Sequence, residues 1–521
     1  MRYREKGSFA HGLSNDSFGS SEDPLNGRLR PTQFADRHKA SVQFPFEVPD
    51  DESIPVDCSA VIVGKKASAT GEVLYGHNED DSGNNVMVQY KVPRAKHEPG
   101  ELITFEPTCA KIPQVEETWS YLWSETRAPW QASFSDTFIN EWGVAVGSDS
   151  CNYSREDNPE LVEGGIGYGV GHIIAQRART AREGVMIAAE LVDRYGYTGS
   201  GRCYQIVDKD EGWVFQVVQG KHYVAQRVPD DEVFFIPNWY TIHKVDLADK
   251  DNFIASPDLI TYAIKRGWYV PAKEGDYSDF DFAAAYQNPT QNQAGNIVRH
   301  KNALRLILGA EPDDPTAFSV KPPRKLGIED VKRILRTHYE GTEDDLSQGY
   351  ELNPHRAGNR TICTGTTLES FVIQFREQPE FTCVWRATLN PCTSPYVPWY
   401  LGISKVPAGY GWLLPQVAFA NHFNVPAGDL SYRPGRAWWA FQDVQDLADA
   451  SYKTVIKTIK ERRDALETKW VNAQEAFEAA ARQAFLEDPA KGIRMLTEYT
   501  DAQAGLAWRT WRALFNDLMK V

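Results

Sequence analysis

Hydrophobic positions along the chain become regular only at Cys58. Residues 58–64 read CSAVIVG, a short apolar run rich in β-branched side chains, and residues 72–78 (EVLYGHN) form a second run of the same kind. The segment between them, 65–71 (KKASATG), is polar and turn-rich. Two such runs joined by a short turn predict an antiparallel β-hairpin.

The predicted hairpin places a thiol beside polar side chains. Folding it at the centre of its turn puts Cys58 opposite His77 and Asn78. Glu79 and Asp80 follow just beyond. Directly opposed residues of an antiparallel pair lie about 5 Å apart. The pattern therefore predicts imidazole, amide and carboxylate groups around one cysteine, which is an arrangement suited to nucleophilic catalysis.

Farther along, the pattern alternates between strand-like and helical stretches. Apolar residues spaced three to four apart predict a helix over about 172–195, and short β-rich runs predict strands after it. Helices and strands in such blocks fit two stacked sheets covered by helices, an α+β fold. The remaining predicted elements are strands at 203–208, 213–218, 222–228, 368–375 and 382–388, helices at 257–267, 294–308 and 328–338, and a loop at 268–293 that is a candidate wall of the pocket.

From Arg436 the pattern becomes that of long amphipathic helices. One apolar stripe includes Trp438, Phe441 and Val444, and charged residues cover the other positions. Asp488-Pro489 interrupts the pattern before a last helix. We therefore divide the chain into a leader at 1–57, a core domain at 58–435 and a C-terminal helical region at 436–521. The stripe predicts packing either against the core domain or against a second subunit, and we expect a homo-oligomer.

The chemistry of Cys58 depends on the peptide bond that precedes it. If that bond is cut, Cys58 carries both a thiol and a free α-amine, whose pKa is about 7.7–8.0 in models. The amine can take the thiol's proton and so generate the attacking thiolate. The alternative is structural, because a single cysteine that opens a buried strand is often only a small apolar side chain.

Longer motifs resemble one known family. The stretch from Cys58 to Asp81 (CSAVIVGKKASATGEVLYGHNEDD) resembles the opening of the cysteine dipeptidases, the dipeptidase A group of N-terminal-nucleophile hydrolases, which includes the secernins. Further resemblance lies in INEWGVA at 139–145, in AQRARTARE at 175–183 and in RTICTGTTLESFVIQFR at 360–376. The resemblance implies a four-layer αββα sandwich and hydrolysis of dipeptides through a thioester.

The same resemblance assigns catalytic roles residue by residue. It implies Cys58 as the nucleophile and Asp80 as the carboxylate beside its amine. Asn140 is expected to donate a hydrogen bond to the oxyanion, a contribution of about 3–4 kcal/mol to lowering the barrier. Asn238 matches an active-site asparagine of the related bile-salt and penicillin V acylases, and Arg360 is a weaker match for their distal arginine.

One position departs from the family pattern. Many members carry arginine where this chain has His77. Arginine is always charged, whereas histidine is mostly neutral at pH 7. We therefore expect His77 and Asn78 to bind substrate, with any binding of a substrate carboxylate at His77 dependent on pH.

Composition limits the other functions. The net charge of −15 argues against nucleic acid or an anionic membrane as a partner. The seven cysteines form no CxxC pair, so their spacing predicts neither zinc nor a disulfide framework. We expect no metal and no cofactor. No apolar stretch approaches the length of a membrane span.

The leader at 1–57 bears on location and on activation. It contains no signal-peptide pattern, which favours the cytoplasm. We interpret it as a propeptide that blocks the amine of Cys58, the alternatives being a disordered tail or a wrongly assigned start. Whether its removal is autocatalytic stays open. Three functions remain: a dipeptidase, an acylase of non-peptide amides, and a secernin-like binding protein without activity.

Overall fold

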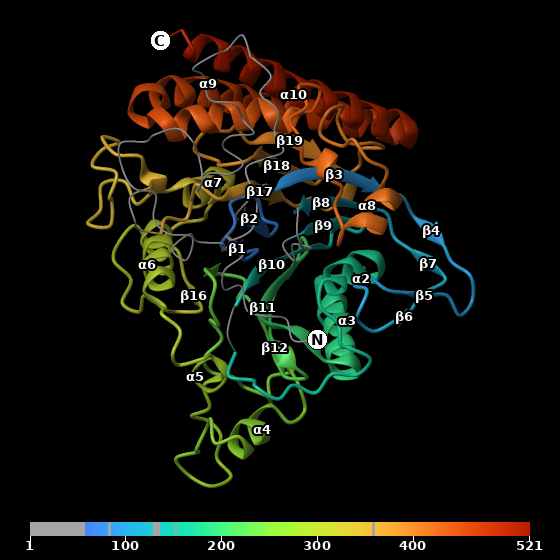
Figure 1. Cartoon of the computed structure of the whole chain (residues 1–521), viewed down its shortest axis with the longest axis vertical. Helices are drawn as coiled ribbons and strands as arrows, with labels where there is room; N and C mark the ends of the chain where they lie inside the picture. The colour runs from blue at the N-terminus through green and yellow to red at the C-terminus, as the bar shows by residue number, and fades with distance from the viewer. Residues whose placement is uncertain (1–57, 82–84, 129–135, 152–153, 357–359, 521) are drawn as a thin grey trace, which may run out of the picture.

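A computed structural model of the chain describes residues 58–81, 85–128, 136–151, 154–356 and 360–520. The predicted leader lies outside these ranges. Two large antiparallel sheets face one another, and helices cover their outer sides (Figure 1). The predicted α+β class and its αββα layering are confirmed.

The first sheet contains the predicted hairpin. Its seven strands run in the order β16, β14, β1, β2, β17, β18, β19. Strands β1 and β2 lie in the interior of the sheet and are buried along their whole length. The bounds are β16 Ser319–Val320, β14 Val233–Ile236, β1 Ser59–Val63, β2 Leu74–Asp80, β17 Thr367–Gln374, β18 Cys383–Thr388 and β19 Val397–Tyr400.

The second sheet has eight strands in the order β15, β13, β12, β11, β10, β9, β8, β3. Two pairs of short strands, β4 with β7 and β5 with β6, form separate ribbons. The bounds are β15 Phe253–Ala255, β13 Tyr223–Arg227, β12 Gly212–Gly220, β11 Tyr197–Val207, β10 Ala145–Ser150, β9 Thr137–Asn140, β8 Tyr121–Arg127, β3 Val86–Val92, β4 Ala95–Lys96, β7 Glu117–Thr118, β5 Leu102–Ile103 and β6 Ile112–Pro113.

The inner faces of the two sheets are in direct contact. The Tyr75 hydroxyl donates to Gln205 Oε1 across the interface at 3.3 Å. Gly147 lies at the hydroxyl end of the same side chain, where a Cβ atom would come within 2.2 Å of the Tyr75 hydroxyl oxygen. Because side chains alternate along a strand, Tyr75, His77 and Glu79 share this inner face of β2, and Asn78 belongs to the outer one.

Helices form the outer layers. Helices α2 (Gly169–Arg177) and α3 (Ala181–Tyr195) cover the second sheet, and α6 (Ala294–Leu308) and α7 (Ile328–Arg336) cover the first. The prediction of one continuous helix over 172–195 is wrong. Thr180 begins a new helix, because its side chain accepts from Glu183 N at 3.1 Å.

The shorter helices lie in the connections. They are α4 Leu259–Lys265, α5 Phe282–Tyr286, α8 Pro415–Asn421 and the 3₁₀ turns η2 Pro354–Arg356, η3 Pro379–Phe381 and η4 Ala427–Asp429. The segment 268–293, predicted as a loop, therefore contains one short helix.

Two long helices end the chain. Helices α9 (Ala437–Glu487) and α10 (Pro489–Leu518) lie along one side of the first sheet, at the top of Figure 1. They separate at Asp488, whose side chain accepts from Ala490 N at 2.9 Å and caps α10. Trp470 and Trp511 are buried in the same hydrophobic core as the sheets. Packing against the core is thus observed, and the domain boundary near 435 stays a prediction.

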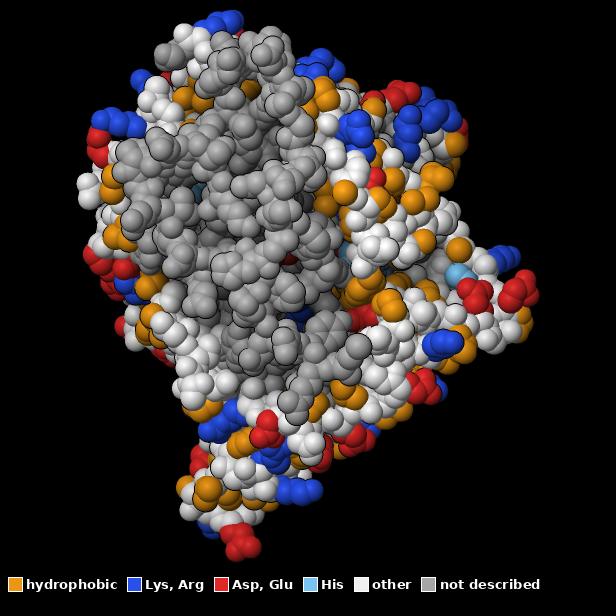
Figure 2. All heavy atoms as spheres, viewed as in Figure 1, with side chains coloured by type: hydrophobic (Ala, Val, Ile, Leu, Met, Phe, Trp, Pro, Cys, Tyr) orange, Lys and Arg blue, Asp and Glu red, His pale blue; other side chains and the backbone are white. Residues whose placement is uncertain are grey.

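The surface carries mixed charge on the face shown in Figure 2, where lysine, arginine and acidic side chains are interspersed with hydrophobic ones over the described residues. None of the helices in the described ranges is long and apolar enough to span a membrane.

Candidate active site

Cys58 immediately precedes β1 and is only 2% exposed. In the hairpin Ser59 pairs with Asn78 and Ala60 with His77, so Cys58 lies across from Glu79. The predicted pairing is therefore shifted by one position. The thiol Sγ donates to Glu79 Oε1 at 3.3 Å, and the carbonyl oxygen of Asp80 lies 3.9 Å from it. The structure thus confirms a polar cluster and adds Glu79 to its centre.

The surroundings of Cys58 keep the proton on sulfur. Burial raises the pKa of the Cys58 thiol well above its usual value, and the negative charges of Glu79, Asp149 and Asp80 raise it further. Asp149 comes from β10 on the opposite sheet and is itself fully buried. The buried guanidinium of Arg202 also acts on Cys58, and further positive charge near the sulfur would favour a thiolate.

His77 lies beside the thiol on the inner face of β2. Its Nε2 is 3.8 Å from Asp149 Oδ2, and its ring stacks on Phe371 with centroids 5.6 Å apart. Burial lowers the pKa of His77 to about 3, although hydrogen bonding of the ring to the backbone carbonyl of Ser148 acts in the opposite direction. The ring is therefore neutral near pH 7. We expected His77 to bind a substrate carboxylate when its ring is protonated, and burial strongly disfavours that protonated form.

Asn78 faces away from Cys58, so the predicted contact with substrate is wrong. Its Nδ2 donates to the carbonyl oxygens of Leu335 and Ile362 at 2.8 and 3.0 Å. Leu335 belongs to α7, which covers the outer face of the first sheet. The residue therefore ties β2 to the outer helical layer.

Asn140 is engaged in local structure at the end of β9. Its Nδ2 donates to the carbonyl oxygens of Ala175 and Ala178 at 3.1 and 2.7 Å. Its Oδ1 accepts from the backbone N–H groups of Trp142 and Val144 at 3.0 Å each. Both amide hydrogens bind carbonyls at the end of α2, so neither is available to an oxyanion. This geometry contradicts the predicted role.

Asn238 and an arginine that the sequence did not single out complete the site. Arg299, on α6, donates through Nη1 to the carbonyl oxygen of Cys58 at 2.9 Å and through Nη2 to Asn238 Oδ1 at 2.7 Å. Because guanidinium only donates, Oδ1 of Asn238 must face it, which directs Nδ2 elsewhere. Within the described residues Nδ2 is buried without a hydrogen-bond partner.

Asn296 and Arg360 hold the same asparagine from two sides. Asn296 Nδ2 donates to the backbone oxygen of Asn238 at 3.0 Å, and Asn296 Oδ1 accepts from Arg299 at 2.6 Å. Arg360 Nη2 lies 3.5 Å from Asn238 Oδ1, so its contact is longer than that of Arg299. The structure brings Cys58, His77, Asp80, Asn238 and Arg360 to one region and places Asn78 and Asn140 outside it.

A signal for Arg299 exists in the sequence. On the predicted helix 294–308, Asn296, Arg299 and His300 recur at the spacing of the apolar residues that follow, Ala303 and Leu304. All five are buried. Polar residues on the core-facing side of a helix indicate internal hydrogen bonds or a site, since buried polar groups need partners.

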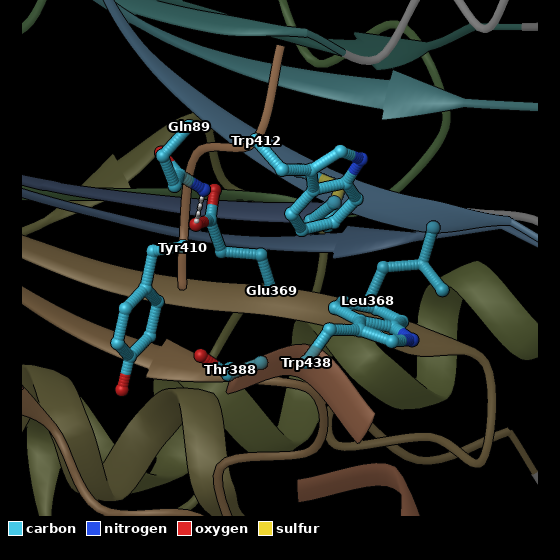
Figure 3. Close-up of a pocket in the computed structure, with 8 residues that line it drawn as sticks. Gln89, Leu368, Glu369, Thr388, Tyr410, Trp412 and Trp438 are labelled. Atoms are coloured by element: carbon cyan, nitrogen blue, oxygen red, sulfur yellow. Dashed lines mark hydrogen bonds between the residues drawn. The ribbon is translucent and has the colours of Figure 1, made fainter. Parts of the chain in front are cut away.

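A separate pocket lies farther across the first sheet from Cys58. On neighbouring strands, Cys58 lies across from Glu79, Glu79 pairs with Glu369, and Glu369 pairs with Thr388. Glu369 accepts from Gln89 Nε2 at 2.9 Å, a bond between the two sheets that Figure 3 shows. The pocket is lined by Met87, Gln89, Leu368, Glu369, Thr388, Tyr410, Trp412 and Trp438.

Comparison with known proteins shows the family of the chain. The chain belongs to peptidase family C69, a family of hydrolases, because the profile of that family matches residues 57–464. A probable dipeptidase of Salmonella dublin is 26% identical over 368 residues, which are 68% of this chain and 83% of that protein. A dipeptidase of Bifidobacterium longum is 24% identical over 84% of this chain and 88% of its own length.

One further relative and one solved structure also match this chain. Probable dipeptidase B of Streptococcus pyogenes serotype M3 is 23% identical over 90% of this chain and 94% of that protein. Among solved structures, a mutant of conjugated bile acid hydrolase from Clostridium perfringens aligns over 64% of this chain and 89% of its own, with 10% identity and a TM-score of 0.26.

Proposed function

We propose that this chain is a dipeptidase whose nucleophile is Cys58, made competent by removal of residues 1–57. The observation that carries the proposal is the position of Cys58 immediately before β1. There its thiol faces Glu79, and its carbonyl oxygen accepts from Arg299. The similar proteins named as dipeptidases, and membership of peptidase family C69, support the choice of substrate.

Electrostatics explains why a free amine is needed. With an amide at its nitrogen, Cys58 is surrounded by the carboxylates of Glu79, Asp149 and Asp80 and by a neutral imidazole. Although the buried Arg202 guanidinium also acts on it, burial and these carboxylates keep its thiol protonated. Cutting the bond before Cys58 creates an amine that can become an ammonium. That positive charge would lie beside Asp80 and Glu79 and would offset the repulsion that opposes a thiolate.

The first half of the reaction forms a thioester. The amine of Cys58 takes the proton from its own thiol, and the sulfur attacks the carbonyl carbon of the dipeptide. A C–S bond forms while the carbonyl π electrons move to oxygen. The ammonium then protonates the departing amine as the C–N bond breaks, releasing the C-terminal amino acid.

Asn238 is the candidate donor to the oxyanion of that intermediate. Its Nδ2 is buried and has no partner among the described residues, and Arg299 fixes the amide through Oδ1. A donor that is already oriented before the reaction needs no reorganisation when charge develops.

The second half releases the acyl group. Water attacks the thioester carbonyl and gives one proton to the amine of Cys58. The C–S bond breaks, the sulfur leaves as a thiolate, and the ammonium returns its proton to the thiolate. The products are the N-terminal amino acid and the original thiol and amine.

Maturation and turnover test the proposal together. Intact-mass measurement of the purified chain is expected to show loss of residues 1–57, and a dipeptide panel should yield free amino acids. Cys58→Ala should abolish hydrolysis. Full hydrolytic rate in Cys58→Ala, or activity of a chain that still carries the leader, would contradict the mechanism.

The alternatives are outcomes of the same assay. Turnover of N-acyl amides without turnover of any dipeptide would make the chain an acylase. A processed chain that hydrolyses neither would favour a secernin-like binding protein. A cytoplasmic location and self-association stay predictions.

A further inference from the structure

A second buried cluster lies on the outer side of the first sheet. Nitrogen atoms of His338 and His355 and the sulfur atoms of Cys363 and Cys392 all lie within 4.8 Å of one another. The four residues come from separate segments: the connection after α7, the turn η2, the segment before β17 and the turn between β18 and β19. Their side chains are at most 2% exposed.

The distances match the edges of a small tetrahedron. His338 Nε2 is 3.2 Å from His355 Nε2, which lies 3.5 Å from Cys392 Sγ and 3.9 Å from Cys363 Sγ. Zinc binds nitrogen at about 2.0–2.1 Å and sulfur at about 2.3 Å, so a tetrahedral site has N–N edges of about 3.3 Å and N–S edges of about 3.6 Å.

The outer nitrogens of both imidazoles face carboxylates. His338 Nδ1 is 3.2 Å from Glu340 Oε1, and His355 Nδ1 is 3.1 Å from Asp449 Oδ1. A carboxylate accepts a hydrogen bond, so it places the proton of each neutral ring on Nδ1. The two Nε2 lone pairs then point at one another, an arrangement that calls for a cation between them.

We propose that His338, His355, Cys363 and Cys392 bind one structural zinc ion. Two nitrogens and two sulfurs in a tetrahedral arrangement suit zinc, and four protein ligands leave no open position for catalysis. Two thiolates also neutralise the ion, which suits a buried site. Carboxylate partners on the outer nitrogens are the usual support of zinc-bound histidines.

The site would fasten the C-terminal helices to the core. Asp449 lies on α9, whereas Glu340 and the four ligands belong to the core. Tyr452, also on α9, has its ring centroid 6.3 Å from that of His338 and 5.8 Å from that of His355. The ligands are too widely spaced for a zinc motif, which is why the sequence predicted none.

Metal analysis of the full chain tests the proposal. Purified protein loaded with zinc and then desalted is expected to hold one zinc per chain, and replacement by Co²⁺ should give the visible bands of a tetrahedral thiolate site. Cys363→Ser and Cys392→Ser should lose the zinc. Cys109→Ser, at a partly exposed cysteine outside the cluster, should keep it.

A variant that keeps all four ligands distinguishes weaker zinc binding from loss of folding. Asp449→Asn keeps all four ligands but removes the charge behind His355, and should weaken zinc binding by about 10–100-fold in competition with a chromogenic chelator. Glu475→Gln, at an exposed position on the same helix, should leave affinity unchanged. A zinc-free chain, a Cys363–Cys392 disulfide shown by mass spectrometry, or unchanged zinc in both serine variants would overturn the proposal.

Discussion

Arg299 donates to the backbone carbonyl oxygen of Cys58 at 2.9 Å, although the two residues are separated by 241 positions in the chain. The same guanidinium holds Asn238 Oδ1 at 2.7 Å. One side chain thus fixes the nucleophile's backbone relative to the proposed oxyanion donor. Arg299 is fully buried and also donates to Asn296 Oδ1 at 2.6 Å, so packing and hydrogen bonds together fix its position.

Replacing Arg299 should therefore lower the rate more than the binding of substrate. Arg299→Lys keeps the charge but cannot donate to both oxygens in one plane. We expect kcat/KM to fall by about 100-fold, most of it in kcat, because misplacing reacting groups has effects of that size. Steady-state kinetics on a cleaved dipeptide measures this. Arg305→Lys, on the same helix but bonded to Glu343, is the matched control and should retain activity.

Asn238 and Asn140 should respond in opposite ways. Asn238→Ala removes the proposed oxyanion donor and should lower kcat by about 100–1,000-fold with little change in KM. Asn140→Ala leaves the carbonyls of Ala175 and Ala178 without partners and should lower the free energy of unfolding by about 1–3 kcal/mol. Its kcat should stay near wild type. A large kcat defect in Asn140→Ala with normal stability would restore the role that the sequence suggested.

The sequence predicts what depends on local pattern. The hairpin around Cys58 is found within one position of its predicted pairing because alternation and turn residues act over short range. The helix at 294–308 is also found with its predicted bounds. The single helix predicted over 172–195 fails because Thr180 and Glu183 form a capping pair that the apolar spacing does not record.

The other residues of the site are brought to Cys58 by packing between segments that are distant in the sequence. Asp149 comes from the opposite sheet and Arg299 from a helix, so no spacing along the chain associates them with Cys58. The prediction that Asn78 contacts substrate fails for another reason. It is adjacent to His77 in sequence, but alternation along β2 sends its side chain to the opposite face.

Stability should fall in acid partly because of His77. The pKa of His77 is about 3 in the folded chain, below its usual value of 6.5. Between these values the unfolded chain binds more protons, so stability is present above pH 6.5 and is lost as pH falls towards 3. His77→Gln should remove this loss, about 1.4 kcal/mol for each pH unit below 6.5. Urea denaturation of both proteins at several pH values measures the difference.

Replacing His77 by arginine should be harmful. His77→Arg places a permanent charge at a fully buried position next to Phe371. We therefore expect less folded protein and not tighter binding of a substrate carboxylate. A well-folded His77→Arg enzyme with a lower KM would show that the ring position is open to substrate.

Glu79 should control the reactivity of the thiol. After burial, its negative charge is the largest influence that raises the pKa of Cys58. Glu79→Gln removes that charge, so the thiolate should form at lower pH and alkylation by iodoacetamide should shift in the same direction. Mass spectrometry of the peptide containing Cys58 follows this residue alone. Glu183→Gln, on α3, is the control, and an unshifted profile in Glu79→Gln would rule out this effect.

Asn78 should matter for stability and not for substrate binding. Its Nδ2 joins the back of β2 to Leu335 and Ile362, and the inner face of the same strand carries His77 and Glu79. Asn78→Ala leaves two buried carbonyls without their donor, which should cost about 1–3 kcal/mol of unfolding free energy. KM should be unchanged because the side chain does not face Cys58. Thermal unfolding and dipeptide kinetics on one preparation separate the two effects, and a raised KM at normal stability would return Asn78 to the substrate site.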